Sequence, residues 1–302
     1  MDIIHQDLWI FLSFAAAAFQ TLRFMLQKVV STATLSPTGA TFARFCYSAP
    51  IIAVLLVLYV QMTSASLDMP EGKFWGFALT GALAQVLATI CVVTLFKMRS
   101  FAVGVTLMKT EVLLSVATGM ILLGEGVSLQ AFVAILIGLI GVLMLSTPPE
   151  IQNARLSDMW NRGVALGLTS GLLFSISAVS YRGASLQIDA QDPILRAGVT
   201  LSVVTGSQMV GMALWLWLRD RPQLKAVWHA RRVAAWIGLM SLAGSFCWFF
   251  AFTLQNAAYV KAVGQVELIF SLLVSIFFFG EKSSRRELLG MAVLTISILA
   301  LI

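Results

Sequence analysis

The chain has 302 residues, of which 59% are hydrophobic and 11% charged, and its formal net charge is +6. Soluble proteins have an apolar share nearer half, so this composition excludes an ordinary soluble fold and predicts an all-α integral membrane protein. Apolar runs of about 20 residues, long enough to cross a bilayer as helices, recur between short polar breaks. The basic residues are spread through these breaks, which argues against a nucleic-acid-binding surface.

Hydropathy predicts ten transmembrane helices in chain order. They are expected near residues 8–27, 37–60, 74–96, 101–123, 129–147, 163–183, 193–218, 233–254, 257–279 and 287–302. The chain starts with acidic residues, unlike the basic leader of a secretory signal, so the first run is expected to remain as a span. The longest break, residues 148–162, contains two prolines and mixed charge. It predicts a linker between a first repeat, residues 1–147, and a second repeat, residues 163–302.

The first and second predicted helices each carry a polar stripe centred on an arginine. The stripes consist of Gln20, Arg23 and Gln27 in the first helix and of Thr41, Arg44 and Ser48 in the second. Arginine keeps its charge in the membrane, so each must meet an anion, carbonyl groups or water. One interpretation is that Arg23, Gln27 and Arg44 bind a carboxylate-bearing substrate. The other is an ion pair between an arginine and a buried glutamate of the resting protein.

The fourth and ninth predicted helices each contain a glutamate, Glu111 and Glu267, and each is followed by serines and by a Gly-Glu pair at matching intervals. A shift of 156 residues superimposes the two patterns, which is an internal repeat. An ionised carboxylate in hydrocarbon costs about 2.5–3.5 kcal/mol on insertion scales, so both are predicted to bind substrate or to couple protons. A buried ion pair or a structural kink is the alternative.

Further polar residues surround these glutamates. Lys109 lies two positions before Glu111, about 200° around an α-helix, so the two are expected to find partners elsewhere. Gln265 is the repeat counterpart of Lys109, and both are predicted to contact substrate. Lys261 shares a helix face with Gln265, and either contributes to the site or extends to the membrane interface.

The eighth predicted helix is crowded with aromatic residues around Trp248. Such a cluster lines a pocket for an apolar or cationic group, or it packs against lipid. Trp248 is included here among the predicted substrate-binding residues.

Several chemistries have no matching motif in the sequence. There is no GxxxxGK[ST] loop, no HExxH pair and no GxSxG elbow, and the two histidines lie outside the predicted spans. The sequence therefore predicts no catalytic residues, no metal site and no cofactor.

Five spans in each half give the two halves opposite orientations, so the repeats are expected to be inverted around a central cavity. Most basic loop residues, including the run from Arg219 to Arg232, fall on one side, whereas Lys73 and Arg182 fall on the other. The excess of positive charge in cytoplasmic loops then predicts that both termini are extracytoplasmic.

The ten spans, the corner sequences LLGEGVS and FFFGEKSS, and closing helices such as AFVAILIGLIGVLML resemble the EamA branch of the drug/metabolite transporter superfamily across essentially the whole chain. The resemblance implies a secondary carrier of the bacterial-type inner membrane with a cavity between its halves. Many members export amino acids or other small metabolites. It also implies cytoplasmic termini, the opposite of the loop-charge prediction.

The expected function is secondary active export of a small polar metabolite, zwitterionic or anionic, such as an amino acid or derivative. Alternating access would move this small-molecule substrate through the lipid bilayer, with protons as the candidate coupling ion. One alternative is a translocase for a phosphate-bearing lipid or lipid-linked substrate. A membrane-embedded enzyme with a glutamate as general base is the least supported, because the sequence offers no nucleophile or metal beyond scattered serines.

Overall fold

The computed structural model describes residues 2–65, 70, 72–97, 108–146, 162–280 and 285–301, and over these residues it is all-helical. The first half contains α1 (Asp2–Ala33), α2 (Pro37–Thr63), α3 (Gly72–Phe96), α5 (Glu111–Leu123) and α6 (Leu129–Ser146). The second half contains α8 (Arg162–Leu186), α9 (Pro193–Arg219), α10 (Arg221–His229), α11 (Arg231–Leu254), α12 (Ala257–Val263), α13 (Glu267–Phe277) and α14 (Arg285–Leu301).

These helices follow the predicted spans in order. Within the described residues, seven spans are long and apolar enough to cross a membrane, one of them formed by α12 and α13 together, and α6 and α14 contain shorter apolar segments. Residues 101–107 of the predicted fourth span and most of the predicted linker, 148–161, lie outside the described residues. The prediction of an all-α, multi-pass membrane fold is confirmed.

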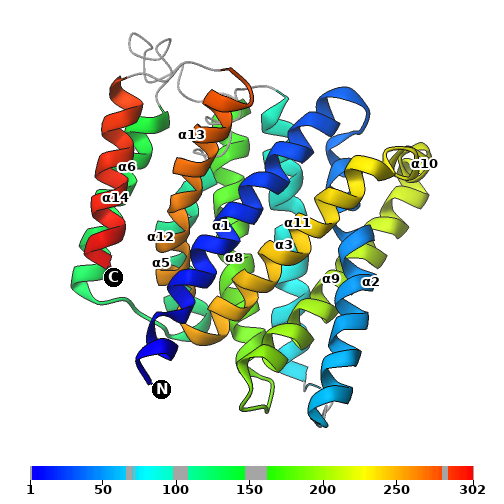
Figure 1. Ribbon diagram of the computed structural model, residues 1–302, viewed down its shortest axis with the longest axis horizontal. Helices are drawn as coiled ribbons and strands as arrows, with labels where there is room; N and C mark the ends of the chain where they lie inside the picture. The colour runs from blue at the N-terminus through cyan, green and yellow to red at the C-terminus, as the bar shows by residue number, and fades with distance from the viewer. Residues whose placement is uncertain are drawn as a thin grey trace.

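The two halves have inverted topology. In Figure 1, α1 and its counterpart α8 run in opposite directions, as do α2 and α9. The contacts between the halves are symmetric as well. Helix α3 of the first half packs on α8 of the second, and the equivalent pair is α11 on α1. Helices α2 and α6 pack on their own counterparts, α9 and α14. This pattern is what a pseudo-two-fold axis between the halves produces.

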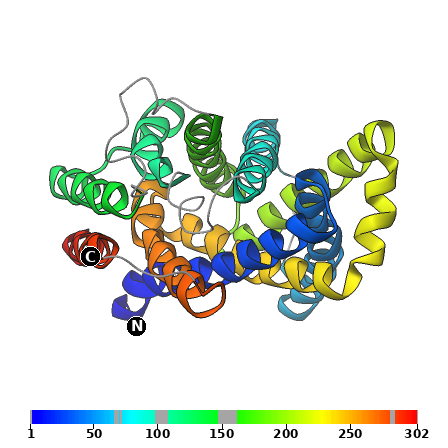
Figure 2. The same cartoon turned by 90° about the horizontal axis from the view of Figure 1, so that it is seen from above.

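Each half contributes helices to both layers of the bundle. Figure 2 shows one layer containing α6, α5, α8 and α3 and a second containing α14, α13, α1 and α11. The contacts α5–α8 and α1–α13 hold helices from different halves side by side within a layer. The space between the layers is therefore lined by both repeats, and this is where a site shared by the halves is expected.

The second helix of each half begins with the same device. Ser36 accepts a hydrogen bond from the backbone N–H of Gly39 and precedes Pro37, the first residue of α2. Asp192 accepts from the N–H of Ile194 and precedes Pro193, the first residue of α9. A side-chain cap satisfies an N–H that has no partner in the helix, and proline suits the first helical position because it lacks that N–H. The repeat is thus visible in local structure as well as in topology.

The two Gly-Glu corners also begin alike, since Gly124 and Gly280 both adopt left-handed backbone conformations with φ of 67° and 68°. Gly124 ends α5, and its N–H bonds to the carbonyls of the last helical turn. A side chain disfavours this conformation.

Gly124→Ala is therefore expected to lower the free energy of unfolding by about 1 kcal/mol, from backbone strain alone, because a Cβ there meets no other atom within 4 Å. Gly126→Ala is the matched control: its Cβ is equally unobstructed and its φ is not left-handed. Unfolding in detergent checks both, and an equal effect of the two variants would contradict the strain argument.

Candidate functional site

The fourth and ninth spans contain 3₁₀ turns at repeat-related positions. A 3₁₀ turn, Met108–Thr110, precedes α5, and a second, Gly264–Val266, separates α12 from α13. Each turn is followed by a glutamate, Glu111 or Glu267, as the first residue of the next α-helix. A carboxylate is favoured there by the helix dipole. The turn between α12 and α13 interrupts the ninth span, and such discontinuous helices are typical of transporter substrate sites.

Two lysines join the two glutamates across the halves. Lys109 Nζ, from the first half, donates to Glu267 Oε2 of the second half and lies 3.6 Å from Glu111 Oε1. Lys261 Nζ, from the second half, lies 3.3 Å from Glu111 Oε2. All four side chains are buried. Their charges cancel, so the cluster is neutral as a whole, which makes its burial in the membrane tolerable.

The expectation about Lys109 and one of the two alternatives for Lys261 were wrong. Lys109 lies within ion-pair distance of Glu111 because α5 begins only at Glu111, so the α-helical angle between the two positions does not apply. Lys261 does not extend to the membrane interface: it is 7% exposed, pairs with Glu111, and its Nζ lies 4.6 Å from the centroid of the Trp248 ring.

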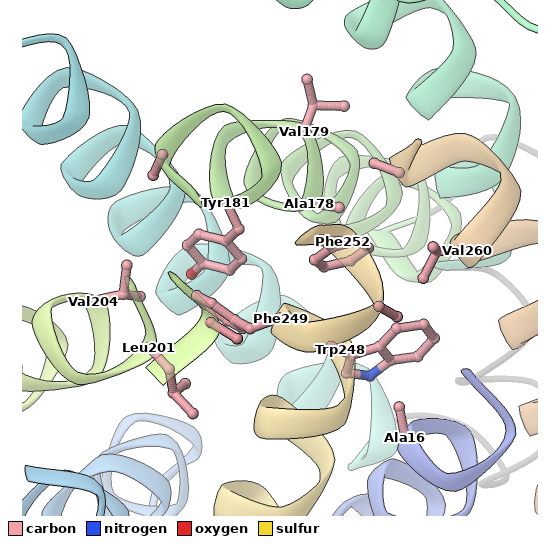
Figure 3. Packing of buried hydrophobic residues seen from close by; sticks show 14 of the residues in the cluster. Ala16, Ala178, Val179, Tyr181, Leu201, Val204, Trp248, Phe249, Phe252 and Val260 are labelled. Carbon is pink, nitrogen blue, oxygen red and sulfur yellow. The ribbon is translucent and has the colours of Figure 1, made fainter. Parts of the chain in front are cut away.

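Gln20 extends the cluster toward the aromatic residues of α11. Its Nε2 donates to Glu267 Oε2 at 2.8 Å, and its Oε1 accepts from Trp248 Nε1 at 3.1 Å. Trp248 is buried and stacks on Phe252, with ring centroids 5.9 Å apart. Figure 3 shows the indole between Phe252 and Ala16 of α1. The lipid-facing alternative is thus wrong for Trp248.

The two buried arginines do not pair with the glutamates. Arg44 donates to hydroxyls of α11 and α3, through Nε to Ser241 (2.7 Å), Nη2 to Ser245 (3.0 Å) and Nη1 to Thr89 (3.4 Å). Arg23 donates through Nη1 to Gln27 Oε1 at 2.9 Å, and its Nη2 has no hydrogen-bond partner among the described residues. The ion-pair alternative was wrong: both glutamates pair with lysines instead, and Glu267 Oε1 has no hydrogen-bond partner among the described residues. Arg23 nevertheless lies within electrostatic range of Arg44 and Glu267.

Two adjoining narrow spaces run between these side chains. One is lined by Arg44 and the other by Gln20, Trp248 and Lys261, and the two share Gln85 among their walls. The second has a cavity volume of about 10 Å³, roughly what one water molecule needs. The space beside Lys261 therefore holds no more than about one water molecule.

The other predicted substrate residues lie outside these spaces. Lys109, Glu111 and Glu267 are paired within the charged cluster and do not line either space. Gln27 accepts a hydrogen bond from Arg23 and donates one to the carbonyl of Ala40. Gln265 lies apart from them, packed close to Gly138 of α6. The lysine of the second half stands at 261 instead, and substrate contact by Gln265 stays a prediction.

An amide and hydroxyl network lies beside Arg44 and was not predicted from the sequence. Gln85 Oε1 lies 2.9 Å from the Tyr181 hydroxyl and accepts from Gln208 Nε2 at 3.0 Å. Tyr181 stacks on Phe249, with centroids 4.4 Å apart, as Figure 3 shows. The available signal was that Gln85 and Gln208 are isolated amides in apolar spans, where polar groups need partners.

One protein family matches the chain twice, once in each half. The EamA-like transporter family matches residues 7–147 and again residues 161–302. The chain belongs to this family. Lys109 and Glu111 lie in the first EamA-like match and Lys261 and Glu267 in the second, so the cluster joins the two repeats. The protein is accordingly a multi-pass membrane transporter of the drug/metabolite type.

The EamA-like fold is also seen in a solved structure described as "Crystal structure of protein". It aligns with a TM-score of 0.69 over 97% of this chain and 94% of that chain, at 14% identity. Likeness at this identity shows the fold alone. No curated protein matches the chain.

Proposed function

We propose that the protein is a secondary active exporter of a small polar metabolite, zwitterionic or anionic, such as an amino acid or derivative. The observation that carries this proposal is the charge balance of the interior. Lys109, Lys261 and the two glutamates cancel, whereas Arg23 and Arg44 have no carboxylate partner in the part of the chain that the structure describes. Buried cations are costly without a counter-charge. An anionic group of the substrate would provide it.

The ion pairs supply a means of coupling. Lys109–Glu267 and Lys261–Glu111 both cross between the halves. A rocking motion of one half against the other must therefore break or exchange these pairs. A proton on a glutamate, or an ammonium group of the substrate, would replace a lysine as its partner. We propose Glu111 and Glu267 as the residues that couple protons to transport.

The distribution of charge supports an orientation in a bacterial-type inner membrane. Arg219, Lys225 and Arg231 lie at the end of the bundle where Figure 1 shows α10, while Arg182 and Arg196 lie toward the opposite end. The positive end is proposed to be cytoplasmic, with both termini outside. Cytoplasmic termini are the alternative.

Substrate flux in proteoliposomes, with and without a pH gradient, tests this function. Wild-type protein is expected to move an amino acid or a small organic anion against its gradient when a pH gradient is imposed. Glu111→Gln and Glu267→Gln are each expected to abolish the response to the pH gradient. Flux and coupling that survive both substitutions would refute the assignment.

Translocation of a phosphate-bearing lipid is less well supported. It needs an opening toward lipid that reaches the arginines, and neither of two apolar surface grooves formed by the described residues has Arg23 or Arg44 in its lining.

A further inference from the structure

Helix α10 differs in direction from the spanning helices. Figure 1 shows it nearly end-on at one end of the bundle, where it connects α9 to α11. Val227 is its buried residue, and Gln223 Oε1 accepts from the backbone N–H of Ser36 at 3.0 Å, which fastens α10 to the start of α2. Arg221 and Lys225 are exposed on its outer side. A short helix of this kind, apolar inward and basic outward across the bundle axis, is typical of a membrane interface.

Basic and aromatic side chains are concentrated around α10. The exposed basic residues are Arg219, Arg221, Lys225, Arg231 and Arg232. The exposed tryptophans are Trp215, Trp217, Trp228 and Trp236. Asp220 is the one acidic residue from 215 to 236. Tryptophan prefers the headgroup level of a bilayer, and clustered basic residues attract anionic lipid headgroups.

A groove on the lipid-facing surface leads to this cluster. It has a volume of about 480 Å³ and is lined by apolar residues of α3, such as Leu83 and Leu87, and by Gly211 and Trp215 of α9. Arg219 follows Trp215 by four residues in α9, so the two lie on the same face and the basic cluster begins about one turn beyond the groove. Thr38, also in the lining, lies next to the attachment of α10 at Ser36.

We propose that this end of the molecule binds an anionic phospholipid, with its phosphate on the basic residues around α10 and an acyl chain in the groove between α3 and α9. The basic residues favour an anionic headgroup because its charge is opposite to theirs. The groove favours a lipid over a soluble phosphate, because only the lipid has an acyl chain that fills the groove. The site is separate from the charged cluster between the layers, so it stands independently of the transport proposal.

Electron spin resonance of the full chain in phosphatidylcholine vesicles tests the headgroup part, with spin-labelled phosphatidylglycerol or phosphatidylcholine as the probe. Wild-type protein is expected to immobilise phosphatidylglycerol in preference. Lys225→Gln/Arg232→Gln should reduce that preference by about tenfold, since each basic residue near an anionic surface contributes to binding. The matched control Lys73→Gln/Arg285→Gln removes two exposed charges distant from α10 and should leave it unchanged.

A second variant pair tests the groove. A Cβ at Gly211 or at Gly206 meets no other atom within 4 Å, so leucine fits both positions, but only Gly211 lines the groove. Gly211→Leu is expected to weaken phosphatidylglycerol immobilisation, and Gly206→Leu is not. Equal immobilisation of the two lipids by wild-type protein would overturn the proposal. So would displacement of phosphatidylglycerol by inorganic phosphate beyond the effect of chloride at equal ionic strength.

Discussion

Arg44→Gln is expected to weaken substrate binding by at least about 30-fold while leaving the free energy of unfolding within about 1 kcal/mol of the wild type. Removing one partner of a buried, hydrogen-bonded charge pair costs about 2–5 kcal/mol of binding, which sets the lower bound. The protein itself loses little, because Arg44 bonds only to neutral hydroxyls among the described residues, so its removal strands no carboxylate. Substrate titration and unfolding of the same purified variants measure the two effects.

Two comparison variants distinguish substrate binding from a structural role. Arg44→Lys keeps the charge but loses the planar fork, so its affinity should fall between those of the wild type and Arg44→Gln. Arg182→Gln should behave in the opposite way, because Arg182 binds both oxygens of Glu125 and the carbonyls of Phe252 and Gln255. Arg182→Gln should unfold more easily than Arg44→Gln but bind the substrate more tightly than Arg44→Gln does. Normal affinity in a destabilised Arg44→Gln would show that Arg44 is structural.

Glu267→Gln is expected to lower the free energy of unfolding by about 3 kcal/mol, because it leaves Lys109 buried with only the more distant Glu111 as a counter-charge. Lys109→Met should cost a similar amount, because it leaves the buried Glu267 carboxylate without its lysine and with only the neutral amide of Gln20 as a partner in the described part of the chain. The double variant Lys109→Met/Glu267→Gln should lose less than the sum of the two single variants, since it removes both charges together. Chemical unfolding of the four proteins measures this coupling.

Transport provides the second measurement for the same variants. The double variant should still lack the response to the pH gradient even where it recovers stability, because the exchangeable pair is gone. Glu125→Gln is the matched control: its pair with Arg182 is partly exposed, at 23% and 14%, so a loss of only about 1 kcal/mol is expected. Additive losses in the Lys109 and Glu267 variants would show that the pair does not hold the halves together.

The cluster combines symmetric and asymmetric features. The glutamates occupy equivalent positions, each at the start of an α-helix after a 3₁₀ turn. The lysines do not, because Lys109 lies in the turn itself, whereas Lys261 lies in α12 before the turn. The two cross-half pairs therefore differ in geometry, so the two glutamates are not expected to contribute equally to coupling.

The fold was largely predictable from local features of the sequence. Apolar runs bounded by polar breaks located the spans, and the displaced pattern of Glu111 and Glu267 revealed the repeat. An odd number of spans in each half then required inversion. These inferences succeed because hydrocarbon demands that the backbone bond within each helix, so length and hydropathy are sufficient to identify a span.

The partners of the buried charges required the packing of helices from both halves. Helical periodicity placed Arg44 and Glu111 on polar faces, but it does not say which neighbouring helix lies opposite each face. The sequence left Lys261 equally open to a place in the site and to one at the membrane interface. It pairs with Glu111 because α12 packs against α5. The short 3₁₀ turn before Glu111 brings Lys109 toward both carboxylates, and no pattern in the chain signals that turn. Side-chain partners are set by distances between segments far apart in sequence, and periodicity along one segment carries no information about those distances.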